Sequence, residues 1–258
     1  MKNVKISIIT ISYNSAKTIE RTIKSVISQH YDNLEYIIID GNSSDGTQKI
    51  IEKYKERISF YISEPDKGIS DAFNKGISYA TGELICMINS DDVMSAGAAQ
   101  RVADSFENGI DVYYGDVISI DQYGNDIRRQ PRRLSRFIFS QPLYHQSTYI
   151  TRKAYEKYGT YDVALKMAMD YELLYKMYSD GAQFKYIPAV LSEFSLEGLS
   201  GSNELKNACA VYRVSIKGGT KKIFALYYLI RSYTTHYLKC LFKGKKMRQI
   251  AYKISDKL

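Results

Sequence analysis

The segment LEYIIIDGNSSDGT, residues 34–47, carries the clearest structural signal in the chain. Its first seven residues form a nearly continuous apolar run ending in Asp40, which is typical of a strand buried on both faces of a sheet. GNSSDGT then supplies turn residues, and Ile50, Ile51 and Tyr54 follow at helical spacing. The segment therefore predicts a strand, a polar turn and a helix, in that order.

Similar units flank that segment on both sides. Upstream, residues 4–12 predict a strand, and apolar residues recur at helical spacing over 19–27. Downstream, residues 58–63 and 84–89 predict strands, with a helix over 69–80 between them. Repeated β–α units of this kind predict an α/β fold built on a doubly wound, mostly parallel sheet.

Beyond residue 95 the alternation loosens. Helices are predicted at SAGAAQRVADSFEN and over 169–181, and DVYYGDVISI, with a turn at 122–125, predicts a strand and hairpin. STYITR and FKYIPAVLSEFSL predict further strands. EGLSGSN then forms a Gly/Ser-rich break, and the last fifty or so residues predict two helices.

The composition excludes several classes of protein. Hydrophobic residues make up 45% and charged residues 25% of the 258 residues, as in a folded globular chain rather than a disordered one. No apolar run is long enough to span a membrane, and the first residues do not resemble a signal peptide. Three cysteines, an odd number without metal-ligand spacing, indicate a reducing compartment. We therefore expect a cytoplasmic protein.

The net charge of +8 is unevenly distributed. Residues 217–258 contain 11 Lys and Arg and one acid, whereas the rest of the chain contains 25 bases and 27 acids. A second basic cluster comprises Arg128, Arg129, Arg132, Arg133 and Arg136. It either attracts a phosphorylated acceptor or forms a solvated basic face.

Polar residues follow three of the predicted strands, at residues 12–14, 40–42 and 89–92. In an open α/β sheet, ligands bind at the carboxyl ends of the strands. Carboxylates gathered there suit a divalent cation such as Mg²⁺ or Mn²⁺, which would hold substrate phosphates. The alternative is that Asp40 and Asp91 only cap the helices that follow them.

Four motifs, in this order and spacing, resemble the family 2 glycosyltransferases with a GT-A fold: SIITISYNSAKTIERTIKSVISQ, IIIDGNSSDGT, ISEPDKGISDAFNKGISYATGE and CMINSDD. The likeness continues through HQSTYITRKAYEKYGTYD and AMDYELLYKM to about residue 200, and it is greatest to bacterial enzymes of O-antigen and exopolysaccharide assembly. It implies a catalytic domain over 1–202, with a nucleotide-binding half (1–95) and an acceptor-binding half (96–202). Residues 203–258 then form a basic helical tail.

On the donor side, the resemblance implies that Tyr13 stacks on the base of a sugar nucleotide. Asp40 would accept a hydrogen bond from the base, which favours a UDP- or dTDP-sugar. Ile11 and Ser12 would line the same pocket, and Asp71 matches a nucleotide-contacting position.

The resemblance also implies the catalytic groups. Asp91 and Asp92 match the metal motif, with Asp92 as the direct ligand of Mn²⁺ or Mg²⁺ and Asp91 nearer the ribose. Asp170 matches the base. The family often has an acid before that base, and Met169 replaces it here, which removes a neighbour able to position the acceptor.

Such residues suit one displacement with inversion. A cation stabilises the charge that develops on the leaving diphosphate, while a carboxylate removes the proton of the attacking acceptor hydroxyl. Two alternatives stay open. A sugar-nucleotide nucleotidyltransferase would need a Gly-rich N-terminal loop, which SYNSAKT does not supply, and an inactive nucleotide-binding subunit would not need to keep Asp170.

Several further residues have either a binding or a structural role. His145 and Gln146 match an HQ pair of the similar bacterial enzymes and either reach the donor or acceptor or serve the structure. Asp66 and Lys67 lie in a loop expected near the nucleotide. Residues 198–202 either close over the donor or form an exposed turn.

The tail predicts a partner of its own. Within 217–258, apolar and aromatic residues recur at helical spacing between lysines and arginines. A basic amphipathic helix of this kind binds the surface of an anionic membrane, which would place a lipid-linked saccharide acceptor within reach at the inner face of a bacterial plasma membrane. The alternative is a helix packed on the catalytic domain. Nothing in the chain resembles a nucleic-acid-binding module.

Overall fold

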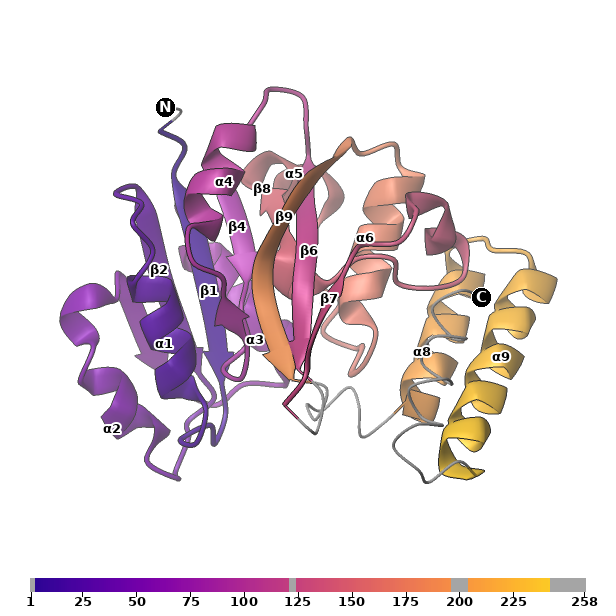
Figure 1. Cartoon of the computed structure of the whole chain (residues 1–258), viewed down its shortest axis with the longest axis horizontal. Coiled ribbons are helices and arrows are strands. Elements are labelled where there is room, and N and C mark those ends of the chain that lie inside the picture. The colour runs from indigo at the N-terminus through magenta and orange to yellow at the C-terminus, as the bar shows by residue number, and fades with distance from the viewer. Residues whose placement is uncertain (1–2, 121–123, 196–203, 242–258) are drawn as a thin grey trace.

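The computed structural model describes residues 3–120, 124–195 and 204–241, and within them nine strands form one sheet (Figure 1). The strands are β1 (Ile6–Ser12), β2 (Leu34–Asp40), β3 (Phe60–Ser63), β4 (Leu84–Met87), β5 (Val93–Met94), β6 (Val112–Ile120), β7 (Asp126–Arg129), β8 (Thr148–Thr151) and β9 (Phe184–Ser195).

Helices connect these strands. The α-helices are α1 (Ile19–Ile27), α2 (Thr47–Glu52), α3 (Ile69–Tyr79), α4 (Ala98–Ser105), α5 (Arg152–Tyr158), α6 (Met169–Ser179), α8 (Glu204–Lys217) and α9 (Lys222–Leu241). Short 3₁₀ helices in the described ranges are η1 (Lys55–Arg57), η2 (Leu134–Ile138) and η3 (His145–Ser147).

The sheet has the strand order β3-β2-β1-β4-β8-β6-β9-β5, and β7 pairs with β6. Strands β1 to β4 are parallel to one another, as the repeated β–α units predict. Strand β8 lies antiparallel between β4 and β6, and β5 and β7 are also antiparallel to their partners. The predicted α/β fold with a mostly parallel sheet is confirmed.

Helices cover both faces of the sheet. On one face, α1, α2 and α4 pack with Ile8, Ile38 and Tyr113 in one hydrophobic core. On the other face, α3, α5 and α6 enclose a second core that contains Ile9 and Ile39. Alternate residues of β1 and β2 therefore serve opposite cores, which explains why these strands are apolar along most of their length.

The C-terminal helices differ in how they pack. Val211 and Val214 of α8 belong to the core that contains α6, and Tyr175 of α6 donates a hydrogen bond to the carbonyl of Gly218. Figure 1 shows α8 and α9 side by side at the end of the molecule beyond α6. The alternative given for the tail, a helix packed on the rest of the chain, therefore describes α8.

Helix α9 presents a second face to solvent. Its inner face includes the fully buried Ala225, whereas Ile223 is 72% exposed and Tyr227 is 56% exposed. Among the described residues, no helix is long and apolar enough to cross a bilayer. The predicted loop closure over 198–202 concerns residues outside the described ranges, as does the end of the tail, 242–258.

Candidate active site

Two interlocked loops stand at the carboxyl ends of β1 and β2. The backbone N–H of Asn14 donates to the Ser43 hydroxyl (2.8 Å), and the N–H of Ser15 donates to the Thr47 hydroxyl (2.8 Å). Asp45 accepts from the N–H of Ala16 (3.0 Å). These bonds fix the loop after β1 against the loop after β2, so that the first strand end has a defined shape without a ligand.

Asp40 is the buried centre of these loops, with 0% exposure. Its Oδ1 accepts from the hydroxyls of Ser12 (2.7 Å) and Ser43 (2.6 Å). Its Oδ2 accepts from the Ser43 N–H (2.9 Å) and the Ser63 hydroxyl (2.7 Å). Because a carboxylate has about four acceptor positions, a base could bond to Asp40 only after one hydroxyl turned away.

Tyr13 stands at the rim of this pocket, with 68% of its surface exposed. Gly41 allows a close approach beside it, because a Cβ there would meet Asp66 Oδ2 at 2.5 Å and the Tyr13 ring at 3.3 Å. Asp66 also accepts from the N–H of Gly68 (2.8 Å). Tyr13, Gly41 and Asp66 therefore form one wall, while Lys67 is exposed next to it. Ile11 is partly buried against the core at the end of β1.

The acidic loop after β4 is held by the polar side chains of helix α1. Arg21 donates to the carbonyl of Asp91 (2.8 Å), and the fully buried Thr22 hydroxyl donates to the carbonyl of Asp92 (2.7 Å). Further along α1, Ser25 accepts from the N–H of Met94 (3.0 Å), and Gln29, just beyond the end of the helix, donates to the carbonyl of Ser95 (3.0 Å). Sequence reasoning missed these residues, although polar side chains on a largely buried helix are a detectable signal.

Asp92 is buried in that loop, and its Oδ2 has no hydrogen-bond partner. Burial, and the neighbouring Asp91 charge, raise the pKa of Asp92 to about 8. An orphaned, buried carboxylate oxygen is what a divalent cation would satisfy. The residues present therefore fit the implied metal, although across the described ranges no group of three or more His, Cys, Asp or Glu side chains is arranged to hold one.

Asp170 lies in the first turn of α6, where Gln141 approaches it at 3.4 Å. The preceding Ala168 has a left-handed backbone (φ 59°), which is unusual for a residue other than glycine and turns the chain sharply into the helix. Met169 is 8% exposed and packs in the core. Residue 169 therefore has a packing role in this protein, and Asp170 lacks the neighbouring acid that the family often has.

His145 joins the two carboxylates. Its Nε2 lies 3.8 Å from Asp92 Oδ2, and its Nδ1 lies 3.9 Å from Asp170 Oδ2. Asn89 lies 2.9 Å from the same Nε2. Burial lowers the pKa of His145, although the charges of Asp170 and Asp91 act in the opposite direction. The proposed metal ligand and the proposed base thus flank one neutral imidazole.

Other expected site residues have structural partners. Asp71 accepts from the N–H of Lys67 (3.0 Å) and lies 3.7 Å from the Lys75 ammonium. Gln146 is only 4% exposed, in contrast to the His145 side chain, which is 27% exposed. The structure therefore brings His145, but not the Gln146 side chain, to an accessible position.

The arginine cluster is partly engaged in structure. The Arg128 guanidinium donates to the fully buried Asp116 (2.8 Å), which also accepts from the Tyr186 hydroxyl (2.6 Å). Arg129 donates to the Ser119 hydroxyl (2.6 Å). These two arginines anchor β7 to β6.

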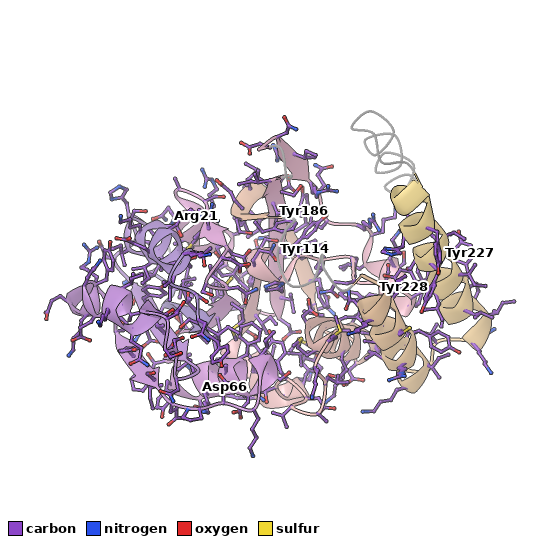
Figure 2. The ribbon with its side chains drawn as sticks, turned by 90° about the horizontal axis from the view of Figure 1, so that it is seen from below. Arg21, Asp66, Tyr114, Tyr186, Tyr227 and Tyr228 are labelled. Carbon is purple, nitrogen blue, oxygen red and sulfur yellow. The ribbon has the colours of Figure 1, made fainter. Side chains whose placement is uncertain are left out.

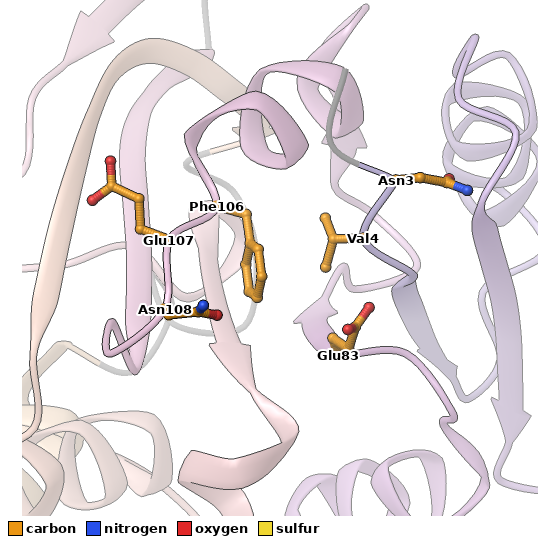
Figure 3. Close-up of a pocket in the computed structure, with 6 residues that line it drawn as sticks. All are labelled: Asn3, Val4, Glu83, Phe106, Glu107 and Asn108. Atoms are coloured by element: carbon orange, nitrogen blue, oxygen red, sulfur yellow. The ribbon is translucent and has the colours of Figure 1, made fainter.

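The acidic site faces away from a separate surface pocket. Figure 2 shows Arg21 and Asp66 in one half of the molecule, with Tyr227 on α9 at the other end. A pocket of about 470 Å³ lies between Asn3, Val4 and Glu83 on one side and Phe106, Glu107 and Asn108 on the other (Figure 3). These residues precede β1, β4 and β6, so the pocket is at the amino ends of the strands and contains none of the expected site residues.

Comparison with known proteins identifies the family. The model of the family described as Glycosyl transferase family 2 matches residues 7–171, more than half of the chain. This chain belongs to glycosyltransferase family 2. The matched range contains all the candidate residues from Ile11 to Asp170 and ends one residue after the proposed base.

Two curated relatives support this membership. The glycosyltransferase is 31% identical over 208 residues to an uncharacterized glycosyltransferase of Mycobacterium tuberculosis, which covers 77% of this chain and 78% of that protein. It is 36% identical over 118 residues to the UDP-Glc:alpha-D-GlcNAc-diphosphoundecaprenol beta-1,3-glucosyltransferase of Escherichia coli. That second match covers 45% of this chain and 47% of the relative.

Solved structures share the GT-A fold of this glycosyltransferase. Residues 1–349 of Staphylococcus aureus TarS, in complex with UDP-GlcNAc, align with a TM-score of 0.69 at 18% identity, over 95% of this chain and 77% of that one. The mannosyltransferase PcManGT of Pyrobaculum calidifontis, in complex with GDP-Man and Mn²⁺, aligns with a TM-score of 0.67 at 15% identity, over 98% and 80%. The predicted fold and transferase activity are confirmed.

Proposed function

We propose that this glycosyltransferase transfers one sugar from a nucleotide donor to an acceptor hydroxyl, with inversion at the sugar carbon and with the help of Mn²⁺ or Mg²⁺. The observation that carries this proposal is the approach of Asp92 and Asp170 to opposite nitrogens of His145. A cation ligand and a general base must both lie close to the reacting carbon, the first on the side of the leaving diphosphate and the second on the side of the acceptor.

The donor binds in the pocket at the ends of β1 and β2. Tyr13, which is exposed at the rim, stacks on the base, and Asp40 recognises its imide edge once the Ser63 or Ser43 hydroxyl turns away. Ile11, Ser12, Asp66, Lys67 and Asp71 complete this region. A uracil or thymine base is favoured, and the UDP-Glc donor of the E. coli relative supports that choice.

Catalysis follows from the two carboxylates. A divalent cation, when bound, stabilises the charge that develops on the diphosphate. Asp92 would supply a buried oxygen to that cation, and the partly buried Asp91, the preceding residue of the same loop, would contact the ribose. Asp170 removes the proton of the acceptor hydroxyl as the new glycosidic bond forms. His145, and Gln146 through its backbone, shape the space between donor and acceptor.

The acceptor is a lipid-linked saccharide, as the name of the E. coli relative states for that enzyme. Two features support it here. Arg132 and Arg231 lie close enough to Arg136 to lower its pKa, after the larger effect of burial, so the acceptor side is positively charged. In addition, α9 exposes apolar side chains along one face, namely Ile223, Leu226, Tyr227, Ile230 and Tyr237.

That exposed face, flanked by the lysines of the tail, rests on an anionic membrane surface, at the inner face of a bacterial plasma membrane. On this reading residues 1–202 are the catalytic domain, with a donor half (1–95) and an acceptor half (96–202). Residues 203–258 are the tail that attaches the domain to the membrane. Family membership favours this transferase over a nucleotidyltransferase or an inactive subunit.

The transferase assay uses UDP-, dTDP- and GDP-sugars with a diphosphoundecaprenol-linked sugar, and detects the product by mass spectrometry. Asp170→Asn should lower turnover by about 10²- to 10⁴-fold while nucleotide binding is retained, because Asp170 does not line the proposed donor pocket. Full turnover by this variant contradicts the assignment of the base, and a product that retains the donor's anomeric configuration contradicts inversion.

Membrane binding is tested separately by flotation with phosphatidylglycerol-containing vesicles. Replacing Ile223, Tyr227 and Ile230 with serine should abolish flotation, because each is more than half exposed in the unbound protein. Replacing the equally exposed Tyr13, on the donor side, is the control and should leave flotation unchanged. Flotation that survives the triple replacement contradicts the membrane role of α9.

A further inference from the structure

The position of His145 suggests more than a contact with substrate. The residue begins η3, directly before the central antiparallel strand β8, and its ring lies between Asp92 of the β4 loop and Asp170 of α6. The two nitrogens are therefore directed at two different carboxylates. What the ring contributes depends on which nitrogen carries the proton.

The neighbour Asn89 answers that question. Its side-chain amide nitrogen lies 2.9 Å from Nε2 of His145, and an amide nitrogen only donates hydrogen bonds. In this arrangement Nε2 accepts from the Asn89 amide with its single lone pair, and the proton of the neutral ring is on Nδ1; a cation would bind Nε2 in place of that amide. A neutral imidazole with an unprotonated Nε2 is the form that binds metal ions.

Asp92 supplies the second half of the site. Its Oδ2 is buried, lacks a hydrogen-bond partner and lies 3.8 Å from Nε2. Two metal–ligand bonds of about 2.1 Å each span up to about 4.2 Å, so one cation can bind both atoms. Two protein ligands are enough for Mg²⁺ or Mn²⁺ when diphosphate oxygens and water complete the coordination.

Asp170 completes the arrangement from the other side. The Nδ1–H of His145 faces Asp170 Oδ2 at 3.9 Å, which a small rotation of either side chain would bring to hydrogen-bond distance. Histidines that bind metals regularly donate their second N–H to a carboxylate, which fixes the ring and raises its basicity. Here that carboxylate is the proposed base.

We propose that His145 binds the divalent cation of the donor through Nε2, together with Asp92, and that its Nδ1–H positions Asp170. This inference rests on the proposed metal-dependent transfer and extends it. One imidazole then contacts both the cation on the leaving-group side and the base on the acceptor side. The separation of Nε2 and Nδ1 in the ring sets the distance between the cation and Asp170.

The test is the electron spin echo modulation of Mn²⁺ bound with UDP. A directly bound imidazole gives a ¹⁴N modulation, and we expect it in the wild-type complex and in His30→Gln, which replaces an exposed histidine after α1. It should vanish in His145→Gln, with at least a tenfold loss of Mn²⁺ affinity. Since the chain has three histidines, these variants assign the signal.

Protein labelled with ¹⁵N-histidine removes any dependence on the folding of the variant, because the ¹⁴N modulation should be replaced by that of ¹⁵N in an unaltered chain. Mn²⁺ that binds with UDP but shows no histidine nitrogen overturns the inference and leaves metal-dependent transfer standing. If Mn²⁺ does not bind with UDP to the wild type at all, the metal requirement of the proposed function fails as well.

Discussion

Replacing Asp92 with asparagine should stabilise the protein without metal and remove its response to metal. Asp92 has a pKa of about 8 in the folded protein against 3.8 ordinarily, since burial and Asp91 oppose its charge. The folded protein therefore keeps a proton that the unfolded chain releases. The contribution of Asp92 to the free energy of unfolding is therefore largest below pH 3.8 and falls as the pH rises toward 8.

The size of the effect follows from that interval. Each pH unit corresponds to about 1.4 kcal/mol, so wild-type stability falls by at most about 4 kcal/mol between pH 3.8 and pH 7. Asparagine does not titrate and avoids this loss, but burying its amide without a hydrogen-bond partner lowers the stability of the variant by about 1–3 kcal/mol. A net gain of about 1–3 kcal/mol at pH 7 is expected, which raises the melting temperature by about 2–4 °C for each kcal/mol.

Thermal unfolding in EDTA at pH 5 and at pH 8 measures this effect. The gain should be large at pH 8 and nearly absent at pH 5, where the wild type has lost little. Asp104→Asn, which changes an exposed carboxylate of α4, should show neither effect. Mn²⁺ with UDP should then stabilise the wild type but not Asp92→Asn. A gain that is the same at both pH values, or a less stable variant at pH 8, refutes the role assigned to burial.

Three other changes probe the same structure. Thr22→Val removes the hydroxyl that donates to the Asp92 carbonyl, so the affinity for Mn²⁺ measured with UDP should fall, whereas Thr22→Ser should keep it. Equal affinities in the two variants would show that this hydrogen bond from α1 does not position the metal ligand. Glu35→Gln tests acid stability: burial opposes the charge, but hydrogen bonds from Ser7, Thr81 and Lys5 outweigh it and lower the pKa of Glu35 to about 2. The contribution of Glu35 to wild-type stability should therefore fall by about 3 kcal/mol between pH 4.5 and pH 2. Denaturant titration at the two pH values should detect this loss in the wild type but not in Glu35→Gln. Tyr13→Ala should weaken UDP binding by about 1–3 kcal/mol in calorimetry while Tyr13→Phe preserves it; an unchanged alanine variant rules out stacking.

The sequence was sufficient to predict the sheet of parallel strands and the acidic residues at its edge. Both follow from local patterns: strands buried on both faces are apolar, and the turns after them are polar. The identity of Asp40, Asp91 and Asp92 as edge residues therefore needed no knowledge of tertiary packing.

Other features depend on contacts between distant segments, which no local pattern contains. His145 is 53 residues from Asp92 and 25 from Asp170 in sequence, and only the insertion of β8 brings it between them. Likewise, the four hydrogen bonds that occupy Asp40 come from three different segments. The composition of the tail is compatible both with membrane binding and with packing on the rest of the chain. Only the tertiary structure shows that α8 joins the core and that one face of α9 stays exposed.

The insertion of β8 also has a consequence for synthesis of the chain. Strand β4 is complete by residue 87, yet its neighbour on one side is β8, whose residues 148–151 emerge much later. Until then β4 has an unpaired edge with the apolar residues Leu84, Ile85 and Cys86, and such edges promote aggregation. A fragment that ends near residue 95 should therefore aggregate, whereas one that continues past 151 can close the sheet. The proposed donor half is therefore not expected to fold independently.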